Sequence, residues 1–349
     1  MAAVNDIGID LGTSNVLFYM KGKGIVLREP TMVAVRSDAR RQVLAVGEEA
    51  KKMMGRTPAN ITAIRPVTEG VIADLDSTQV MIKYLIHKAN DFNVPIVRPR
   101  VVVCVPCGIT PVERQAVQQV VRSAGARSVH LVDEPVAAAI GAGLPVEEAS
   151  GSMVVDIGGG TSEMAVLSMN GIAAMRSLPF GGETMDEDIV RWFWREKGVL
   201  IGMRTAEQLK RELGTVLPED EDEMAGDDPV LVKGKEASTG RPASVETCSQ
   251  DVKKALEESV VRVIDAMKNA LYNIPPELSS DLLETGIQLS GGGALLTGLK
   301  ERLEREVGVP VHVSAHPQRD VILGLGAAAS DERLMTLLER GGALDLTGD

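Results

Sequence analysis

One short pattern occurs twice in this sequence and restricts the possible folds more than any other feature. An apolar run, Ile7–Asp10, leads into Gly, Thr, Ser and Asn at 12–15, and Val154–Asp156 leads into Gly158–Ser162. Another apolar run follows each turn, so each copy predicts a β-hairpin. The two Asp residues lie 156 − 10 = 146 positions apart, which is about one domain length. We therefore predict an internal duplication with one hairpin per domain; chance similarity of two short segments is the alternative.

Strands and helices alternate through the rest of the chain. The run Val101–Val105 is typical of a buried strand, and Thr110–Glu113 then has the Thr, Pro and Glu spacing of a capped helix start. The spacing of apolar residues predicts helices over 77–87, 112–124, 251–272 and 331–340, with further helix starts near Glu134, Ala294 and Val321. A hairpin is expected from 230–233 and 243–247. This alternation predicts an α/β fold.

Charge and cysteine content exclude several classes of protein. With 37 basic and 49 acidic residues the net charge is −12, which argues against a general nucleic-acid binder and against attachment to anionic lipid by charge alone. Three cysteines cannot form a disulfide framework. The start of the sequence has no signal-peptide pattern, and no apolar run has the length of a membrane span. We therefore expect a cytoplasmic protein.

Glycine-rich segments are the main indication of chemistry. Four are expected to be turns after strands: 12–14, 158–161, 291–293 and 324–326. Backbone N–H groups in such turns can approach an anion closely because no Cβ intervenes. The hydroxyl groups of Thr13, Ser14, Thr161 and Ser162 add donors. Each turn alone is more often an ordinary turn, but two facing hairpins would hold a polyphosphate from both sides. Asp10 and Asp156 then suit Mg²⁺, which takes few protein ligands.

The other motifs in the sequence give little support for a different nucleotide, redox or metal site. The sequence lacks the Gly-Lys-Ser/Thr pattern of a P-loop. Gly324–Gly326 fits a loose dinucleotide pattern but leaves too little chain after it for the required βαβ unit. Cys104 and Cys107 form a Cys-x-x-Cys pair without a second pair, so buried small side chains are the preferred interpretation. The four histidines have no metal-ligand spacing.

The order of five segments resembles the superfamily of actin, Hsp70 and sugar-kinase ATPases. These segments are 10–15, 134–141, 156–163, 290–293 and 324–327. Within it the sequence closely resembles the MreB family of bacterial actins over roughly residues 5–335. The matching stretches are IDLGT at 9–13, GIVLxEP at 24–30, EPxAAAIG at 134–141, IGxxTAE at 201–207 and GGGALL at 291–296.

The resemblance implies ATP or ADP and Mg²⁺ as ligands, and it assigns roles to particular residues. Glu134 matches the acid that positions the attacking water, with Thr161 as its partner, while Asp10 and Asp156 would hold Mg²⁺ through water. Glu183 stands where Asp or Asn is expected, which leaves a ribose contact there in doubt. The nucleotide would be bound at the phosphates by Gly12, Thr13, Ser14, Asn15, Gly158, Gly159, Gly160 and Thr161, at the ribose by Glu207 and Lys210, and at the adenine by Gly291, Gly292 and Gly293.

The implied architecture is two α/β domains around a nucleotide cleft, each with a small subdomain. The first large domain would comprise 1–32, 66–145 and 316–340, and its subdomain 33–65. The second large domain would comprise 146–181 and 246–315, and its subdomain 182–245.

The resemblance also implies a function. A protein of this kind is a slow, Mg-dependent ATPase that polymerises with ATP and organises cell-wall synthesis and rod shape together with membrane proteins of cell-wall elongation. It forms paired protofilaments, with Val112 at the lateral contact; ordinary core packing of Val112 is the alternative. It also lies on the inner face of the cytoplasmic membrane, and the expected membrane loop carries Phe92, Val94, Ile96 and Val97, unless these side chains fold back onto the core.

Two other activities within the superfamily compete with a filament. An Hsp70-like chaperone needs a substrate-binding domain after the ATPase, and we expect no room for one beyond residue 349. A sugar or acetate kinase needs a general-base Asp and a substrate pocket, and we find no second acidic motif for that role. The filament is therefore the preferred hypothesis.

Overall fold

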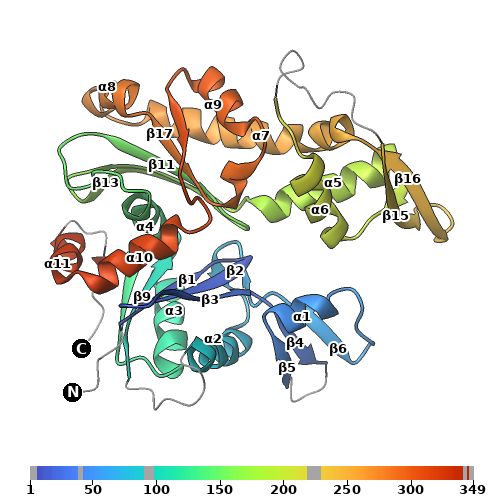
Figure 1. The fold of residues 1–349 in the computed structure, drawn as a ribbon, viewed down its shortest axis with the longest axis horizontal. Helices are drawn as coiled ribbons and strands as arrows, with labels where there is room; N and C mark the ends of the chain where they lie inside the picture. The colour runs from blue at the N-terminus through green and yellow to red at the C-terminus, as the bar shows by residue number, and fades with distance from the viewer. Residues whose placement is uncertain (1–5, 38–41, 90–97, 218–228, 341–343, 346–349) are drawn as a thin grey trace.

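The computed structural model describes residues 6–37, 42–89, 98–217, 229–340 and 344–345. Two large sheets form its framework, one in the lower and one in the upper half of Figure 1. The first has the strand order β19-β10-β9-β1-β2-β3. These strands are β1 (Ile7–Leu11), β2 (Asn15–Met20), β3 (Gly24–Pro30), β9 (Arg100–Val105), β10 (Ser128–Asp133) and β19 (Leu344–Asp345). The second has the order β13-β12-β11-β17-β18, with β11 (Ser152–Ile157), β12 (Ser162–Ser168), β13 (Gly171–Leu178), β17 (Ile287–Ser290) and β18 (Val311–Val313).

The two sheets repeat one plan. In the first, β1 pairs antiparallel with β2 and parallel with β9, and β2 pairs antiparallel with β3. In the second, β11 pairs antiparallel with β12 and parallel with β17, and β12 pairs antiparallel with β13. Both predicted hairpins therefore occupy the same position in their sheets, and the duplicated α/β fold expected from the sequence is confirmed.

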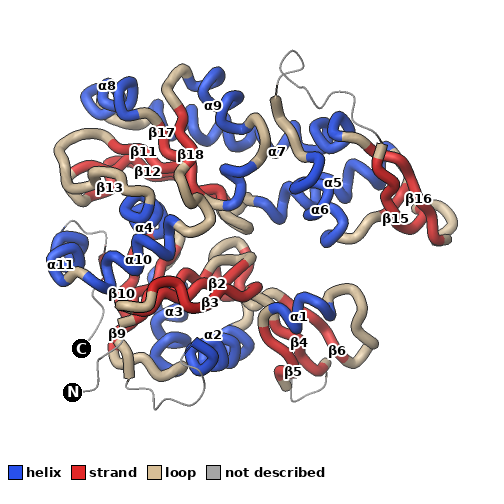
Figure 2. Tube along the Cα trace, in the orientation of Figure 1, coloured by secondary structure: helices blue, strands red, loops and turns tan. Residues whose placement is uncertain are grey.

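Helices cover the outer faces of both sheets and fill the space between them (Figures 1 and 2). On the first sheet, α2 (Leu75–Ala89) and α3 (Pro111–Ser123) cover a core of Val and Ile side chains. Thr110 forms the predicted capping box with Glu113 at the start of α3. The second sheet is covered by α7 (Ser249–Tyr272), α8 (Pro276–Thr285) and α9 (Leu299–Val307). Helices α4 (Glu134–Gly141) and α10 (Asp320–Ser330) pack together between the sheets, and α11 (Glu332–Arg340) follows α10.

Two small lobes extend from the same end of the molecule, at the right of Figure 2. The first small lobe contains α1 (Glu48–Met53) and the strands β4 (Val33–Arg36), β5 (Val43–Val46) and β6 (Ile61–Ile64). The second small lobe contains α5 (Gly182–Glu196), α6 (Met203–Leu213) and the strands β14 (Val199–Leu200), β15 (Val230–Glu236) and β16 (Pro242–Thr247). A two-stranded ribbon, β7 (Val67–Thr68) and β8 (Val71–Ile72), follows the first small lobe.

Two local predictions were wrong. The segment Gly324–Gly326 is not a turn, because it lies inside α10. A Cβ on Gly324 would overlap the backbone of Ala137 in α4, so this glycine permits close contact between two helices. The helix expected near Ala294 is only a short 3₁₀ turn, η1 (Gly292–Leu295). The α-helix begins at Leu299, after Gly298 adopts the left-handed conformation with φ 79°.

Candidate functional site

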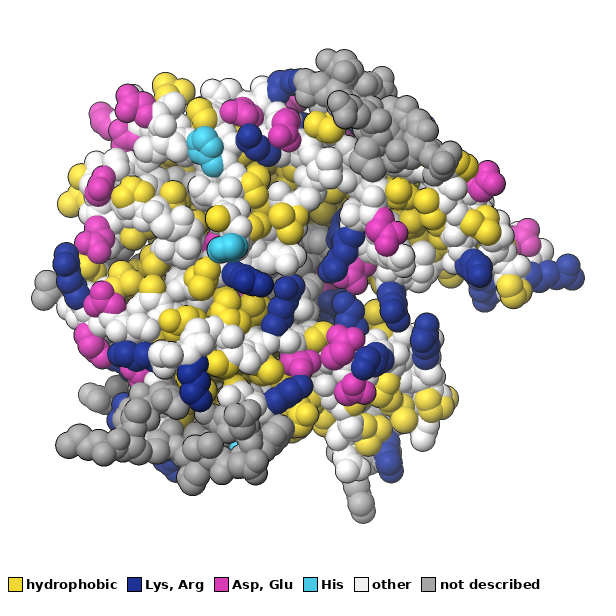
Figure 3. Space-filling model, viewed as in Figure 1, with side chains coloured by type: hydrophobic (Ala, Val, Ile, Leu, Met, Phe, Trp, Pro, Cys, Tyr) yellow, Lys and Arg dark blue, Asp and Glu magenta, His cyan; other side chains and the backbone are white. Residues whose placement is uncertain are grey.

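The main cavity lies between the two large sheets and opens between the two small lobes. Its volume is about 810 Å³, a size that suits a small-molecule or cofactor ligand. Residues from both sheets and from both small lobes line it. Figure 3 shows the molecule hollowed here, with basic and acidic side chains gathered at the opening.

The turns of the two duplicated hairpins touch each other at one side of this cavity. A Cβ on Gly160 would lie 2.6 Å from Thr13 Oγ1, and a Cβ on Gly159 would collide with the Ser14 side chain. Both contacts would be closer than packed atoms allow. Glycine at positions 159 and 160 therefore permits the two turns to meet. Two sets of backbone N–H groups are therefore brought together, as a polyphosphate site requires.

Nearly all predicted nucleotide-site residues line the cavity. They are Asp10, Gly12, Thr13, Ser14, Asn15, Glu134, Asp156, Gly158, Gly159, Thr161, Glu207, Lys210, Gly291, Gly292 and Gly293. Gly160 is not among the lining residues, since it packs against Thr13. The expectation for Ser162 was wrong: its hydroxyl group is fully buried and donates a hydrogen bond to the Phe180 carbonyl at 2.8 Å.

Four carboxyl groups with raised pKa values lie at or beside the inner end of the cavity. Burial raises the pKa of Asp10 to about 6 and that of Asp156 to about 7. The pKa of Glu134 is raised well above its usual range by burial and by the nearby charge of Asp156. Glu163, behind the lining, also has a pKa raised by burial to about 7. A cation placed among these carboxyl groups would favour their charged forms and so lower their pKa values.

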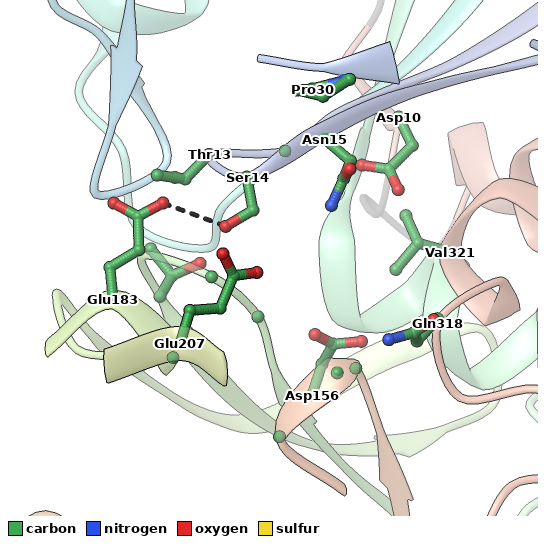
Figure 4. A pocket seen from close by; sticks show the side chains of 18 of the residues that line it. Asp10, Thr13, Ser14, Asn15, Pro30, Asp156, Glu183, Glu207, Gln318 and Val321 are labelled. Atoms are coloured by element: carbon green, nitrogen blue, oxygen red, sulfur yellow. Dashed lines mark hydrogen bonds between the residues drawn. The ribbon is translucent and has the colours of Figure 1, made fainter. Parts of the chain in front are cut away.

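The donor set fits Mg²⁺. Asp10 and Asp156 are the next-to-last residues of the equivalent strands β1 and β11, and they face the cavity from opposite sides (Figure 4). One buried oxygen of Asp156, Oδ2, has no hydrogen-bond partner within the described part of the chain. Among the residues that the structure describes, no three or more His, Cys, Asp or Glu side chains form a group that could hold a metal ion. Two carboxylates with water and phosphate oxygens match what Mg²⁺ usually takes from a protein.

The sequence did not reveal the ionic contacts at the opening of the cavity. Glu183 accepts a hydrogen bond from Ser14 Oγ at 3.0 Å, shown dashed in Figure 4, and forms an ion pair with Arg65. Lys51 of the first small lobe lies 3.5 Å from Glu207 of the second. Arg65 and Glu183 are 118 positions apart in the sequence, and Lys51 and Glu207 are 156 positions apart. No local sequence signal predicts contacts between such distant positions.

Two predicted nucleotide contacts are already engaged within the protein. Lys210 lies 2.7 Å from the Asp186 carboxylate and donates to the Gly182 carbonyl. Glu207 also pairs with Arg211 at 2.5 Å. Both side chains remain on the cavity wall, so a ribose would have to share these partners or replace them.

The remaining predictions concern surfaces outside the cavity. Val112 is 75% exposed in the first turn of α3, so the alternative that it is ordinary core is wrong. Phe92, Val94, Ile96 and Val97 lie outside the described residues. Within the part of the chain that the structure describes, no helix is both long enough and apolar enough to cross a membrane. Cys104 and Cys107 are both buried and unpaired by disulfide, as expected.

Equivalent hairpins on the two sides of one cavity, in two sheets of the same plan, define the actin-like ATPase fold, and this chain has that fold. The family model for MreB/Mbl protein matches residues 4–336. The chain therefore belongs to the MreB/Mbl family of bacterial actin-like proteins.

Individual relatives are similar over nearly their whole length. The cell shape-determining protein MreB of Escherichia coli K12 is 47% identical over 327 residues, which cover 93% of each chain. The cell shape-determining protein Mbl of Bacillus subtilis 168 is 45% identical over 321 residues, which cover 92% of this chain and 94% of Mbl. The crystal structure of MreB5 of Spiroplasma citri bound to AMPPNP has a TM-score of 0.88 and 29% identity, and covers 98% of this chain and all of that one. These similarities favour a cytoskeletal protein over a kinase.

Proposed function

We propose that this chain binds Mg-ATP in the cavity, hydrolyses it slowly, and polymerises into a filament that determines cell shape. The observation that carries the proposal is the meeting of the two glycine-rich hairpins beside Asp10 and Asp156. The MreB5 relative bound to AMPPNP and the relatives named cell shape-determining proteins support it.

Most of these cavity residues would bind the nucleotide and its metal ion, and Glu134 and Thr161 would take part in hydrolysis. The turns 12–15 and 158–161 would bind the phosphates through backbone N–H groups. Mg²⁺ supplies charge neutralisation on the phosphates when bound, and Asp10 and Asp156 would hold it through water. Glu134, at the start of α4, would accept a hydrogen bond from the attacking water and orient it, with Thr161 beside it. Gly291–Gly293 would back the adenine, and Glu207 and Lys210 would reach the ribose.

Assembly and location form the second part of the proposal. The chain would form paired protofilaments through the exposed Val112, on the inner face of the cytoplasmic membrane, with Phe92, Val94, Ile96 and Val97 as the membrane contact. Its partners would be further copies of itself and membrane proteins of cell-wall elongation. The proposed domain boundaries are those expected from the resemblance.

Calorimetric titration with Mg-ATP tests the proposal at its centre. The unmodified chain should bind Mg-ATP, and Asp156→Ala should bind it more weakly because the metal loses an ordered carboxylate. An unchanged affinity in this variant would contradict the metal site. A pelleting assay with and without Mg-ATP, run beside a coupled kinase assay on sugars and acetate, separates a filament from a metabolic kinase.

A further inference from the structure

The two small lobes are joined by charged side chains at the opening of the cavity. Arg65 directly follows β6 of the first small lobe, and its guanidinium pairs with Glu183 in the first turn of α5 in the second. Further out, Lys51 of α1 pairs with Glu207 of α6 at 3.5 Å. Both pairs therefore connect opposite walls of the same cavity, at the end away from the packed helices α4 and α10 (Figure 1).

The inner pair is more shielded from water than a typical surface ion pair. The side chains of Arg65 and Glu183 are 24% and 21% exposed, whereas those of Lys52 and Glu49, a pair within the first small lobe, are 59% and 73% exposed. Shielding limits screening by salt and makes the loss of one partner more costly. The inner pair should therefore contribute more to lobe contact than exposed pairs do.

The length of Glu183 matters for this contact. Its carboxylate reaches both Ser14 in the turn after β1 and Arg65 at the base of the first small lobe. Asp or Asn, the residues expected here from the resemblance, are one methylene shorter. Glu183 thus joins the second small lobe to two separate points on the other wall.

We propose that Arg65 and Glu183, with Lys51 and Glu207 as a weaker outer pair, form a clamp that limits release of the bound nucleotide. This inference rests on the proposed nucleotide site and adds a gate to it. The nucleotide would lie in the cavity behind these side chains, so the lobes must separate and both pairs must break before it leaves. Arg65 and Glu183 act here as positioning residues, through the distance between the lobes.

The experiment measures the rate at which a fluorescent ATP analogue, bound with Mg²⁺, is displaced by excess ATP in a stopped-flow instrument. The main variant is Glu183→Gln, which keeps the size and a hydrogen-bond acceptor for Ser14 but removes the charge. Arg65→Gln removes the other charge. Each should release the analogue about three- to tenfold faster, the size expected for one partly shielded ion pair. The rate of analogue binding should change less than the rate of release.

Two further variants show whether the effect comes from the pair itself. Reversing both charges, Arg65→Glu with Glu183→Arg, should return release toward the original rate, which a merely structural role for either residue would not do. Glu306→Gln is the matched control, because Glu306 pairs with Lys268 on the far side of the second sheet at 2.7 Å. The control should leave release unchanged.

The possible results separate the clamp from the nucleotide site. If the unmodified chain does not bind the analogue, the proposed function fails. If it binds and both single variants release it at the original rate, the clamp is wrong and the site stands. If the charge-reversed chain does not fold, as a thermal melt would reveal, the two neutral variants decide the outcome.

Discussion

At the scale of single residues, the lack of a Cβ decides how closely the two glycine-rich turns can approach each other. Glycines in the turns 12–15 and 158–161 were expected near phosphate, and Gly159 and Gly160 turn out to be needed for contact between the turns. Ser162 was misplaced because strand alternation turns it inward, toward the Phe180 carbonyl. A hydroxyl in a turn motif carries no signal about which face it will take once the strand has formed.

Glu134→Ala tests the hydrolytic role at this scale. Alanine cannot accept a hydrogen bond from water, so phosphate release should slow by about 10²- to 10⁴-fold. Binding of Mg-ATP should persist, because the phosphate turns and both Asp residues are unchanged. Phosphate release is measured in a coupled assay and binding by calorimetry. Hydrolysis at the original rate would remove Glu134 from the mechanism.

The raised pKa of Asp156 predicts a pH dependence of stability. This carboxyl group has a pKa of about 7 in the folded protein, above its ordinary value of 3.8. Well below pH 3.8 it is neutral in both the folded and unfolded states and contributes nothing. As the pH rises toward 7 the unfolded chain releases the proton first, so this group lowers the free energy of unfolding progressively.

Asp156→Asn isolates that contribution. Without nucleotide or Mg²⁺, the variant should melt at a higher temperature than the unmodified chain at pH 8, because the cost of the buried charge is gone. The difference should shrink at pH 5.5, where the native carboxyl group is mostly protonated. Thermal unfolding of both proteins at the two pH values measures it. A difference that does not change with pH would show that the carboxyl group is not buried as a charge.

At the scale of elements, the repeat of the two hairpins was the strongest prediction and it extended further than expected. The pattern around Asp10 and Asp156 predicted two hairpins, and the structure repeats five strands of each sheet in one order. The role of α10 could not be predicted in this way. Its Gly and Ala content predicts a helix, but only the folded structure brings Gly324 against Ala137 of α4, 187 positions earlier (324 − 137).

Gly324→Ala tests the contact between α4 and α10. In an isolated helix this change would be favourable, but here the added Cβ would overlap the Ala137 backbone and push the helices apart. We expect a loss of about 1–3 kcal/mol in the free energy of unfolding, the usual cost of overpacking. Denaturant unfolding measures it. Gly202→Ala is the control, since a Cβ there meets no atom within 4 Å. Equal stability of the two variants would contradict the close helix contact.

At the scale of the whole molecule, the cavity exists only because two distant parts of the chain face each other. The sequence alone predicted paired hairpins, and the resemblance supplied their arrangement around a cleft. The contacts of Lys51, Arg65 and Glu183 were not predictable from either, because they depend on how close the two small lobes lie to each other. The same limit applies to the proposed contacts between copies of the chain, in which the exposed Val112 would take part.

Val112→Glu tests assembly into paired protofilaments. Val112 follows Pro111 at the start of α3 and is 75% exposed, so its side chain contributes little to the core. A negative charge in the first turn of a helix is favourable to the helix itself, so the monomer should keep its stability. In a lateral contact, however, the new charge would be buried without a partner, at a cost of several kcal/mol.

Electron microscopy of filaments grown with Mg-ATP should therefore find single protofilaments, or none, for Val112→Glu. Val261→Glu provides the control, because Val261 is also exposed, at 40%, but lies on α7. It makes the same change of charge and apolar surface at a different place and should leave paired filaments intact. Nucleotide binding should be unchanged in both variants, since neither position lines the cavity. Paired filaments of normal appearance in Val112→Glu would place the lateral contact elsewhere on the molecule.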